Sequence, residues 1–356
     1  MSHKYVLLKE VCEKASSNIA QKDLAECDGI YPIYGASGYI KSVDFFQQAK
    51  DYIAIVKDGA GIGRAMKLPA KSSVIGTMQY VLPNDNINIS YLYYAICSMH
   101  LEKYFSGATI PHIYFRDYQN EQLPLPTLEE QAKIANVFGR IDYFIKKEKE
   151  QLINLDKLVK SRFIEMFGDV EESSKRWNTV YLEKVIQSIE SGWSGNGIQR
   201  DKLEGEIAVL KVSAVTKGFF IPSECKVLED QKNIKKYIYP HKDDLLFSRA
   251  NTKEMVGATV IISKDFPELI LPDKLWRIRF NELANIYFIK YVLSSRSIRN
   301  KLSSEATGTS GSMYNISMQK LKQLAIPLPP TDLQNNFAAF VSKIDKSKFV
   351  VTAKFQ

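Results

Sequence analysis

The chain has 356 residues, of which 45% are hydrophobic and 25% charged, with a formal net charge of +8. These fractions are typical of folded proteins and exclude a largely disordered, collagen-like or low-complexity chain. At about 100–200 residues per domain, the length predicts two domains. No apolar run approaches the ~18 residues that span a bilayer, and the first residues form no apolar signal core. We therefore expect a cytoplasmic protein with no membrane partner.

The four cysteines and four histidines are scattered along the chain. They form no CxxC pair and no spacing that would hold structural zinc, so the sequence predicts no metal site and reduced thiols. The positive net charge is compatible with nucleic-acid binding but does not identify it, because many other proteins are equally basic.

The first globular region, residues 1–122, alternates short β-rich runs with polar turns. Residues 52–56 predict a strand and residues 90–99 a helix. The second region, from a linker at residue 169 to residue 325, behaves in the same way, with strands over 245–247 and 256–262 and a helix over 286–293. Strands and helices mix without strict βαβ alternation, so the fold class predicted for both regions is α+β.

A glycine-rich segment follows the first of these strands. Residues 57–64 read Lys-Asp-Gly-Ala-Gly-Ile-Gly-Arg, but they complete neither a GxxxxGK[ST] nor a GxGxxG pattern, and a strand rather than a helix follows. The favoured interpretation is a turn between strands. The functional alternative is a turn whose amides and basic side chains reach DNA phosphates or base edges; its candidates are Lys57, Gly59, Gly61, Gly63 and Arg64.

Three further polar segments are candidates for the same role. In the second region, residues 247–253 occupy the place of the glycine-rich segment and supply Ser248, Arg249, Asn251 and Lys253, which include side chains suited to guanine and adenine edges. A polar loop also precedes each helical junction. These loops supply Thr109, His112 and Tyr114 in the first half and Thr309, Ser310, Tyr314 and Asn315 in the second. A plain surface loop is the alternative for each.

Each globular region ends in a proline-rich segment followed by a long helix. Residues 123–168 form the first, with Thr127 and Glu130 spaced as a capping box, and Thr331 and Gln334 predict the same device in the second, residues 326–356. Apolar residues recur at three- and four-residue steps, which predicts a coiled-coil seam with a partner helix. The predicted seam comprises Phe138, Ile141, Ile145, Leu152, Leu155, Val159 and Met166 in the first helix and Val341, Ile344 and Val351 in the second.

The two junctions are copies of each other. Residues 123–142 align with 326–345 at a constant shift of 203, and seven of the twenty positions are identical. Under this shift, Gln356 corresponds to Ile153, so the second helix ends early. We expect Leu155, Val159 and Met166 to lack a partner within the chain, and another protein subunit or a second copy of the chain to cover them.

No catalytic constellation accompanies these features. A DNA amino-methyltransferase needs an Asn/Asp-Pro-Pro-aromatic tetrad, whereas the one Pro-Pro pair, Pro329-Pro330, lies at the start of a helix. A magnesium-dependent nuclease needs paired carboxylates with a lysine, and Glu224-Cys225-Lys226 has no upstream partner. The sequence predicts a binding protein rather than an enzyme.

The whole chain resembles the specificity subunit of type I DNA restriction-modification systems. The resemblance rests on the two junctions, on residues 158–168 at the end of the first helix, and on residues 55–63 and 244–249 with Gly257. It implies two target-recognition domains held apart by antiparallel coiled-coil spacer helices, each domain reading half of a split double-stranded DNA site. It also implies two methyltransferase partners that use S-adenosylmethionine and motor-nuclease partners that use ATP and Mg²⁺, with no cofactor in this chain. A methyltransferase subunit is then an expected cover for Leu155, Val159 and Met166, beside a second copy of the chain. The alternatives are a non-catalytic coiled-coil scaffold for other ligands and a self-contained nuclease.

Overall fold

The structure is a computed structural model that describes residues 4–107, 111–170, 176–308 and 313–353. The chain forms two compact units, Met1–Lys147 and Glu148–Gln356. The division falls inside one continuous helix, α3 (Leu128–Phe167), so each unit receives half of that helix. In the described part of the chain, no helix is both long enough and apolar enough to cross a membrane.

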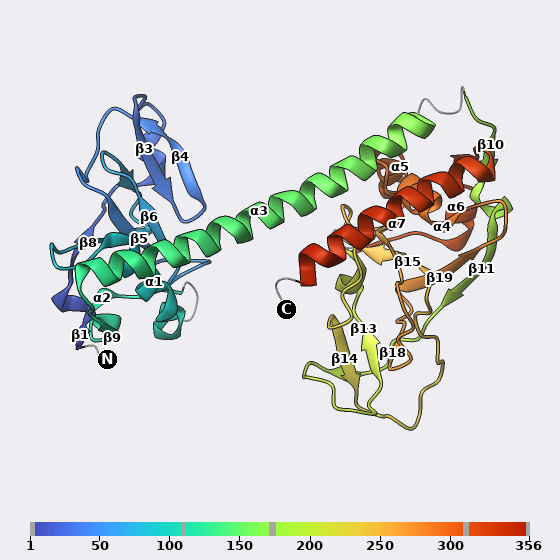
Figure 1. Cartoon of the computed structure of the whole chain (residues 1–356). Helices are drawn as coiled ribbons and strands as arrows, with labels where there is room; N and C mark the ends of the chain where they lie inside the picture. The colour runs from blue at the N-terminus through green and yellow to red at the C-terminus, as the bar shows by residue number, and fades with distance from the viewer. Residues whose placement is uncertain (1–3, 108–110, 171–175, 309–312, 354–356) are drawn as a thin grey trace. The chain divides into compact units, whose positions relative to one another are not determined.

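The first unit contains a four-stranded sheet in the order β2-β8-β5-β6, a three-stranded sheet β4-β3-β7 and the strand pair β1-β9. The helices α1 and α2 and the first half of α3 complete it (Figure 1). The bounds are β1 Tyr5–Leu7, β2 Cys12–Ser16, β3 Tyr31–Gly35, β4 Gly38–Val43, β5 Tyr52–Val56, β6 Ala65–Leu68, β7 Ser73–Val74, β8 Met78–Pro83, β9 Gln122–Pro124, α1 Ile89–Ser98 and α2 Phe115–Tyr118.

Among the described residues, the second unit repeats this arrangement with twelve strands where the first has nine. Its sheets have the orders β11-β19-β15-β17 and β12-β14-β13-β18, and β10-β21 and β16-β20 are strand pairs. The bounds are β10 Thr179–Tyr181, β11 Ile186–Ser191, β12 Gly197–Ile198, β13 Ala208–Leu210, β14 Cys225–Leu228, β15 Leu245–Ser248, β16 Ala250–Asn251, β17 Thr259–Ile261, β18 Leu269–Ile270, β19 Leu275–Phe280, β20 Tyr314–Asn315, β21 Ala325–Pro327, α4 Ile286–Ser294, α5 Arg296–Glu305, α6 Met318–Lys322 and α7 Thr331–Ala353.

The central strand of each main sheet is buried on both faces. In β5, Ile53 and Ile55 pack with the helical layer, whereas Tyr52, Ala54 and Val56 pack on the opposite face. In β15, Leu245 and Phe247 lie in one core and Leu246 lies in another. Because alternate strand residues point to opposite faces, a continuous apolar run is what a strand between two cores requires. The predicted α+β class is confirmed, and so are the predicted strands and helices, except that the strand predicted over 256–262 is confined to β17, Thr259–Ile261.

The beginning of α3 follows the prediction, and the beginning of α7 does not. The Thr127 amide donates to Glu130 Oε2 at 3.0 Å, and the Glu130 amide donates to Thr127 Oγ1 at 3.3 Å, as in a capping box. The prediction that Thr331 and Gln334 form the same box is wrong, because the Gln334 side chain bonds elsewhere: its Nε2 donates to Pro329 O and Leu283 O, and its Oε1 accepts from the Asn285 backbone amide. At its other end, α3 stops at Gly168, which has a left-handed φ of 83°.

All four cysteines are free, and the described residues contain no cluster of side chains that could hold a metal ion. Cys12 and Cys225 are buried, whereas Cys27 is half-buried and Cys97 is exposed. Burial raises the pKa of the Cys12 thiol to about 12, which keeps it protonated at neutral pH.

Candidate nucleic-acid interface

In the first unit, the structure brings the glycine-rich segment, residues 57–64, together with the polar loop that contains His112 and Tyr114. The Gly59 amide donates to Pro111 O at 3.0 Å, and the Ile113 amide donates to Lys57 O at 2.9 Å. The side chains of His112 and Asp58 meet through Nδ1 and Oδ1 at 2.6 Å. The sequence identified both loops separately, and the Asp58–His112 pair that joins them was not predicted.

The three glycines of the segment have left-handed φ values of 82°, 92° and 80° at Gly59, Gly61 and Gly63. Other residues rarely adopt this conformation. At Gly63 a Cβ would also lie 2.5 Å from the backbone nitrogen of Glu102. The glycines are therefore required by the tight turn between β5 and β6, as the favoured interpretation holds.

The side chains around this turn supply cationic and aromatic groups. Arg64 is exposed and donates from Nη2 to Ala36 O at 2.6 Å. Tyr114 is 45% exposed, and the Arg116 guanidinium lies 4.8 Å from its ring centroid. The ring of His112 stacks against Tyr114 at 6.4 Å. Such groups can contact phosphates and stack on bases.

The second unit joins its two loops in the same way. The strand β16 pairs with β20, which places Asn251 opposite Tyr314 and Ala250 opposite Asn315. The Ile316 amide donates to Arg249 O at 2.9 Å. This bond is the counterpart of the bond from Ile113 to Lys57, so both units hold the same pair of segments through the same backbone contact.

Within this second pair of loops, the side chains differ in how far solvent reaches them. Arg249 is half-buried, donates from Nε to Asp273 O at 3.0 Å and lies 5.9 Å from the ring of the buried Trp276. Lys253 is exposed, and Asn251 is half-buried. Ser248 is fully buried, so the prediction that its side chain contacts DNA is wrong: it lies inside the sheet, where its Oγ accepts from Asn251 Nδ2 at 3.3 Å.

Three predicted contact residues, Thr109, Thr309 and Ser310, lie outside the described residues. The seam residue Val351 belongs to α7, but its side chain is not described. The described site therefore does not include these four side chains.

The two long helices pack as an antiparallel pair in the second unit. Phe163 of α3 meets Phe337 of α7 with ring centroids 5.4 Å apart, and Asp156 Oδ1 lies 2.6 Å from Lys348 Nζ. The contact closer to the C-terminus of α3 involves the N-terminal part of α7, and the contact further from it involves the C-terminal part of α7. The two helices therefore run antiparallel, as Figure 1 shows. Burial, with the neighbouring Lys348, lowers the pKa of Lys290 on α4 beside this pair.

The expectation that Leu155, Val159 and Met166 lack a partner is therefore wrong. Val159 is fully buried and belongs to the core of the second unit, and Leu155 and Met166 are half-buried. The error came from using the shift between repeats to locate the partner, whereas an antiparallel helix meets α3 from the opposite direction. Two core residues of the same helix, Phe163 and Phe167, were missed although they continue the stripe at four-residue steps from Val159.

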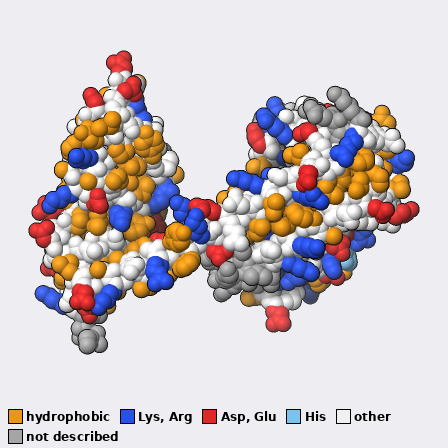
Figure 2. Space-filling view, turned by 45° about the horizontal axis from the view of Figure 1, so that its top comes forward, with side chains coloured by type: hydrophobic (Ala, Val, Ile, Leu, Met, Phe, Trp, Pro, Cys, Tyr) orange, Lys and Arg blue, Asp and Glu red, His pale blue; other side chains and the backbone are white. Residues whose placement is uncertain are grey.

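An exposed apolar face lies instead on the first half of α3. Phe138 and Ile141, both predicted seam residues, are 45% and 46% exposed, and Val137 and Phe144 are each 57% exposed. Ile145 and Leu152 are half-buried. We call Val137, Phe138, Ile141 and Phe144 the α3 apolar face. Figure 2 shows hydrophobic patches among Lys and Arg side chains on the visible face of each unit.

Fold and site together define a tandem-repeat protein in which two similar domains each present a pair of joined polar loops and each carry a long helix. The family model described as the type I restriction modification DNA specificity domain matches residues 3–156 and again residues 174–354. The chain belongs to this family.

Two curated relatives agree with the family match. The EcoEI specificity subunit of Escherichia coli is 27% identical over 197 residues, which cover 53% of this chain and 33% of that protein. The MjaVIII specificity subunit of Methanocaldococcus jannaschii is 25% identical over 314 residues, which cover 82% of this chain and 72% of that protein. The chain thus spans one third of the length of the first relative and most of the second.

Among solved structures, the S subunit of a type I restriction-modification system from M. genitalium has a similar fold. The TM-score is 0.59 at 14% identity, with 99% of this chain and 92% of that chain covered. At this level of identity the likeness concerns the fold.

Proposed function

We propose that this chain is the DNA-binding specificity subunit of a type I restriction-modification complex and reads a bipartite double-stranded target, one half with each unit. The observation that carries the proposal is the repeated pair of loops, joined in one unit through Ile113 and Lys57 and in the other through Ile316 and Arg249. Two readers of the same construction and different side chains suit two half-sites of different sequence.

The side chains proposed to touch DNA are the accessible ones of these loops. In the first unit they include Arg64, His112 and Tyr114, and in the second they include Arg249, Asn251, Lys253, Tyr314 and Asn315. Lys57 and the three glycines would shape the approach of the backbone. Thr109, Thr309 and Ser310 remain predictions from the sequence.

The test exchanges one reader. Residues 177–325 are replaced by the corresponding domain of another family member, and methylated sites are mapped in cells that carry the chimera and the methyltransferase partner. We expect one half-site to change and the other to stay. A simultaneous change of both half-sites, or no change in either, would contradict the proposal.

Catalysis is assigned to partners. The chain would dock two methyltransferase subunits, which hold S-adenosylmethionine, and in the restriction complex the motor-nuclease subunits, which use ATP and Mg²⁺. The purified chain, incubated with S-adenosylmethionine and target DNA, should transfer no methyl group until the methyltransferase is added. Methyl transfer by the chain alone would overturn this assignment.

The α3 apolar face is the proposed docking surface for a methyltransferase subunit. The four side chains of this face are each about half exposed, so covering each one would contribute at most about half of the roughly 1.5–3 kcal/mol that full burial gives. The double substitution Ile141→Ser with Phe144→Ser should weaken co-purification with the methyltransferase and leave the melting temperature of the chain unchanged. Lys133→Ser, at an exposed position of the same helix, is the control. Loss of self-association instead would assign the face to a second copy of the chain.

A further inference from the structure

One glutamine of each junction makes the same set of hydrogen bonds. Gln131 Oε1 accepts from the Asn88 amide at 2.7 Å, while its Nε2 donates to Pro126 O at 2.8 Å and to Asn86 O at 3.3 Å. The side chain is fully buried. It thus bonds both to the segment that leads into α3 and to the loop in front of α1.

The second unit repeats these contacts atom for atom. Gln334 Oε1 accepts from the Asn285 amide at 2.8 Å, and its Nε2 donates to Pro329 O at 2.8 Å and to Leu283 O at 3.1 Å. This side chain is also fully buried. The two glutamines are related by the shift of 203 that relates the junctions.

The residue at the far end of each contact has a defined task. Asn88 is the N-cap of α1, where its side chain accepts from the amides of Ser90 and Tyr91, and Asn285 is the N-cap of α4, where it accepts from the Tyr287 amide. Each glutamine therefore bonds the first turn of a domain helix to the first turns of a long helix. One side chain connects the two elements.

The loops around these contacts have diverged while the contacts have not. The carbonyl that accepts from the glutamine belongs to Asn86 in one copy and to Leu283 in the other, and Ile87 corresponds to Ala284. If the glutamine only satisfied a local buried carbonyl, a different polar side chain could do so in each copy. The same three-bond pattern in both copies indicates a shared requirement on the angle between domain and helix.

We infer that Gln131 and Gln334 are positioning residues that set the orientation of each recognition unit on its long helix and thereby the separation of half-sites that the protein accepts. This inference rests on the proposed function. Neither side chain touches DNA. They act through α1 and α4, whose N-termini they hold, while apolar side chains next to them, Ala135 and Phe337, anchor the same helical turns in the cores.

The test measures spacing rather than affinity alone. The full chain, in complex with its methyltransferase partner, is titrated with duplexes that carry both half-sites, taken from the methylated sites of cells, at the native spacing and with one base pair added or removed. We expect Gln131→Ala and Gln334→Ala each to lower the preference for the native spacing about tenfold, because each variant loses the three hydrogen bonds that connect its long helix to the first turn of α1 or α4. Base preferences within each half-site should not change.

Three controls make the result decisive. Gln151→Ala, at an exposed position of α3, should keep the wild-type spacing preference. Gln131→Met and Gln334→Met keep the volume and remove the polar atoms, so they should reproduce the effect of alanine without its cavity. Folding is monitored by circular dichroism, and a methionine variant that does not fold would overturn the inference, because the glutamine would then be a determinant of folding.

The outcomes separate this inference from the proposal beneath it. A wild-type complex that does not distinguish DNA sequences overturns both. A wild-type complex that does, with folded glutamine variants that keep its spacing preference, overturns the positioning role and leaves the proposed function in place.

Discussion

Equivalent positions on the two long helices have opposite environments. Phe138 and Ile141 of α3 are 45% and 46% exposed, whereas their counterparts at the shift of 203, Val341 and Ile344 of α7, belong to or pack against the core of the second unit, with Val341 at 2% exposure. The difference comes from the last turns of α3, which cover α7. The repeat is therefore asymmetric: the end of the first long helix packs into the core of the second unit, whereas Phe138 and Ile141 near its beginning stay partly exposed.

This asymmetry predicts the largest difference between matched substitutions. Phe163→Ala should lower the free energy of unfolding by about 3–5 kcal/mol, because it empties a site surrounded by Phe167, Phe288 and Phe337. Phe138→Ala, on the exposed counterpart face, should cost less than about 1 kcal/mol. Urea unfolding of the isolated chain measures both. Equal losses would show that the α3 apolar face is already covered within the chain.

The loops of the first unit allow a second matched comparison. Gly63→Ala adds a left-handed alanine and a Cβ at 2.5 Å from the Glu102 nitrogen, and should cost about 2–4 kcal/mol. Gly59→Ala meets no atom within 4 Å and should cost only the backbone strain of about 1–2 kcal/mol. Thermal unfolding distinguishes them, and the reverse order would refute the geometry of the turn.

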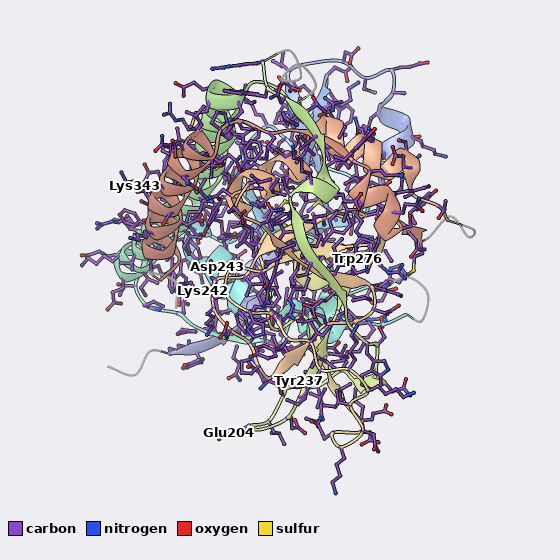
Figure 3. All side chains as sticks on the ribbon, turned by 90° about the vertical axis from the view of Figure 1, so that its right-hand side faces the viewer. Glu204, Tyr237, Lys242, Asp243, Trp276 and Lys343 are labelled. Atoms are coloured by element: carbon purple, nitrogen blue, oxygen red, sulfur yellow. The ribbon has the colours of Figure 1, made fainter. Side chains whose placement is uncertain are left out.

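The ion pair between the long helices should contribute less. Lys348→Ala removes the contact with Asp156, and because the Asp156 side chain is 60% exposed, the loss should stay below about 1 kcal/mol and shrink at high salt. Lys343→Ala, on the outer face of α7 (Figure 3), should change nothing measurable. An equal effect of both substitutions would argue against the antiparallel register.

The smallest expected effect concerns acid stability. Hydrogen bonding to Arg200 lowers the pKa of Glu206 in the second unit from 4.5 to about 2. The stability from this group is therefore complete above pH 4.5 and is lost as the pH falls towards 2. Glu206→Gln should flatten the acid side of the stability profile in this range, while Glu204→Gln, at a neighbouring exposed position, should not. A profile of Glu206→Gln identical to that of the wild type would contradict the assignment.

The sequence predicted elements better than contacts. The shift between residues 123–142 and 326–345 identified the duplication, the long helices and the loops, because these depend on local patterns. The shift did not predict which residues of α3 contact α7. The register of an antiparallel helix pair depends on how the core of the second unit holds α7, here through Phe337. For the same reason the sequence predicted a local cap for Gln334, whereas two of its hydrogen-bond partners lie about 50 positions away in the chain.

The reading loops show a similar limit. The glycines of residues 57–64 indicated a turn, and the sequence identified candidate residues in both loops of each pair. It could not indicate that Ser248 is buried or that Asp58 meets His112, because both depend on the packing of strands distant in the chain.

The covered and exposed helix faces can be compared directly by thiol labelling. Ile141→Cys and Ile344→Cys are made in a Cys97→Ser background, which removes the exposed native thiol, and the background protein is the control. In the isolated chain, the thiol at 141 should react many times faster than the thiol at 344. Addition of the methyltransferase partner should slow the reaction at 141 and leave 344 unchanged. Equal rates in the isolated chain, or an unprotected thiol at 141 in the complex, would contradict this account of the repeat.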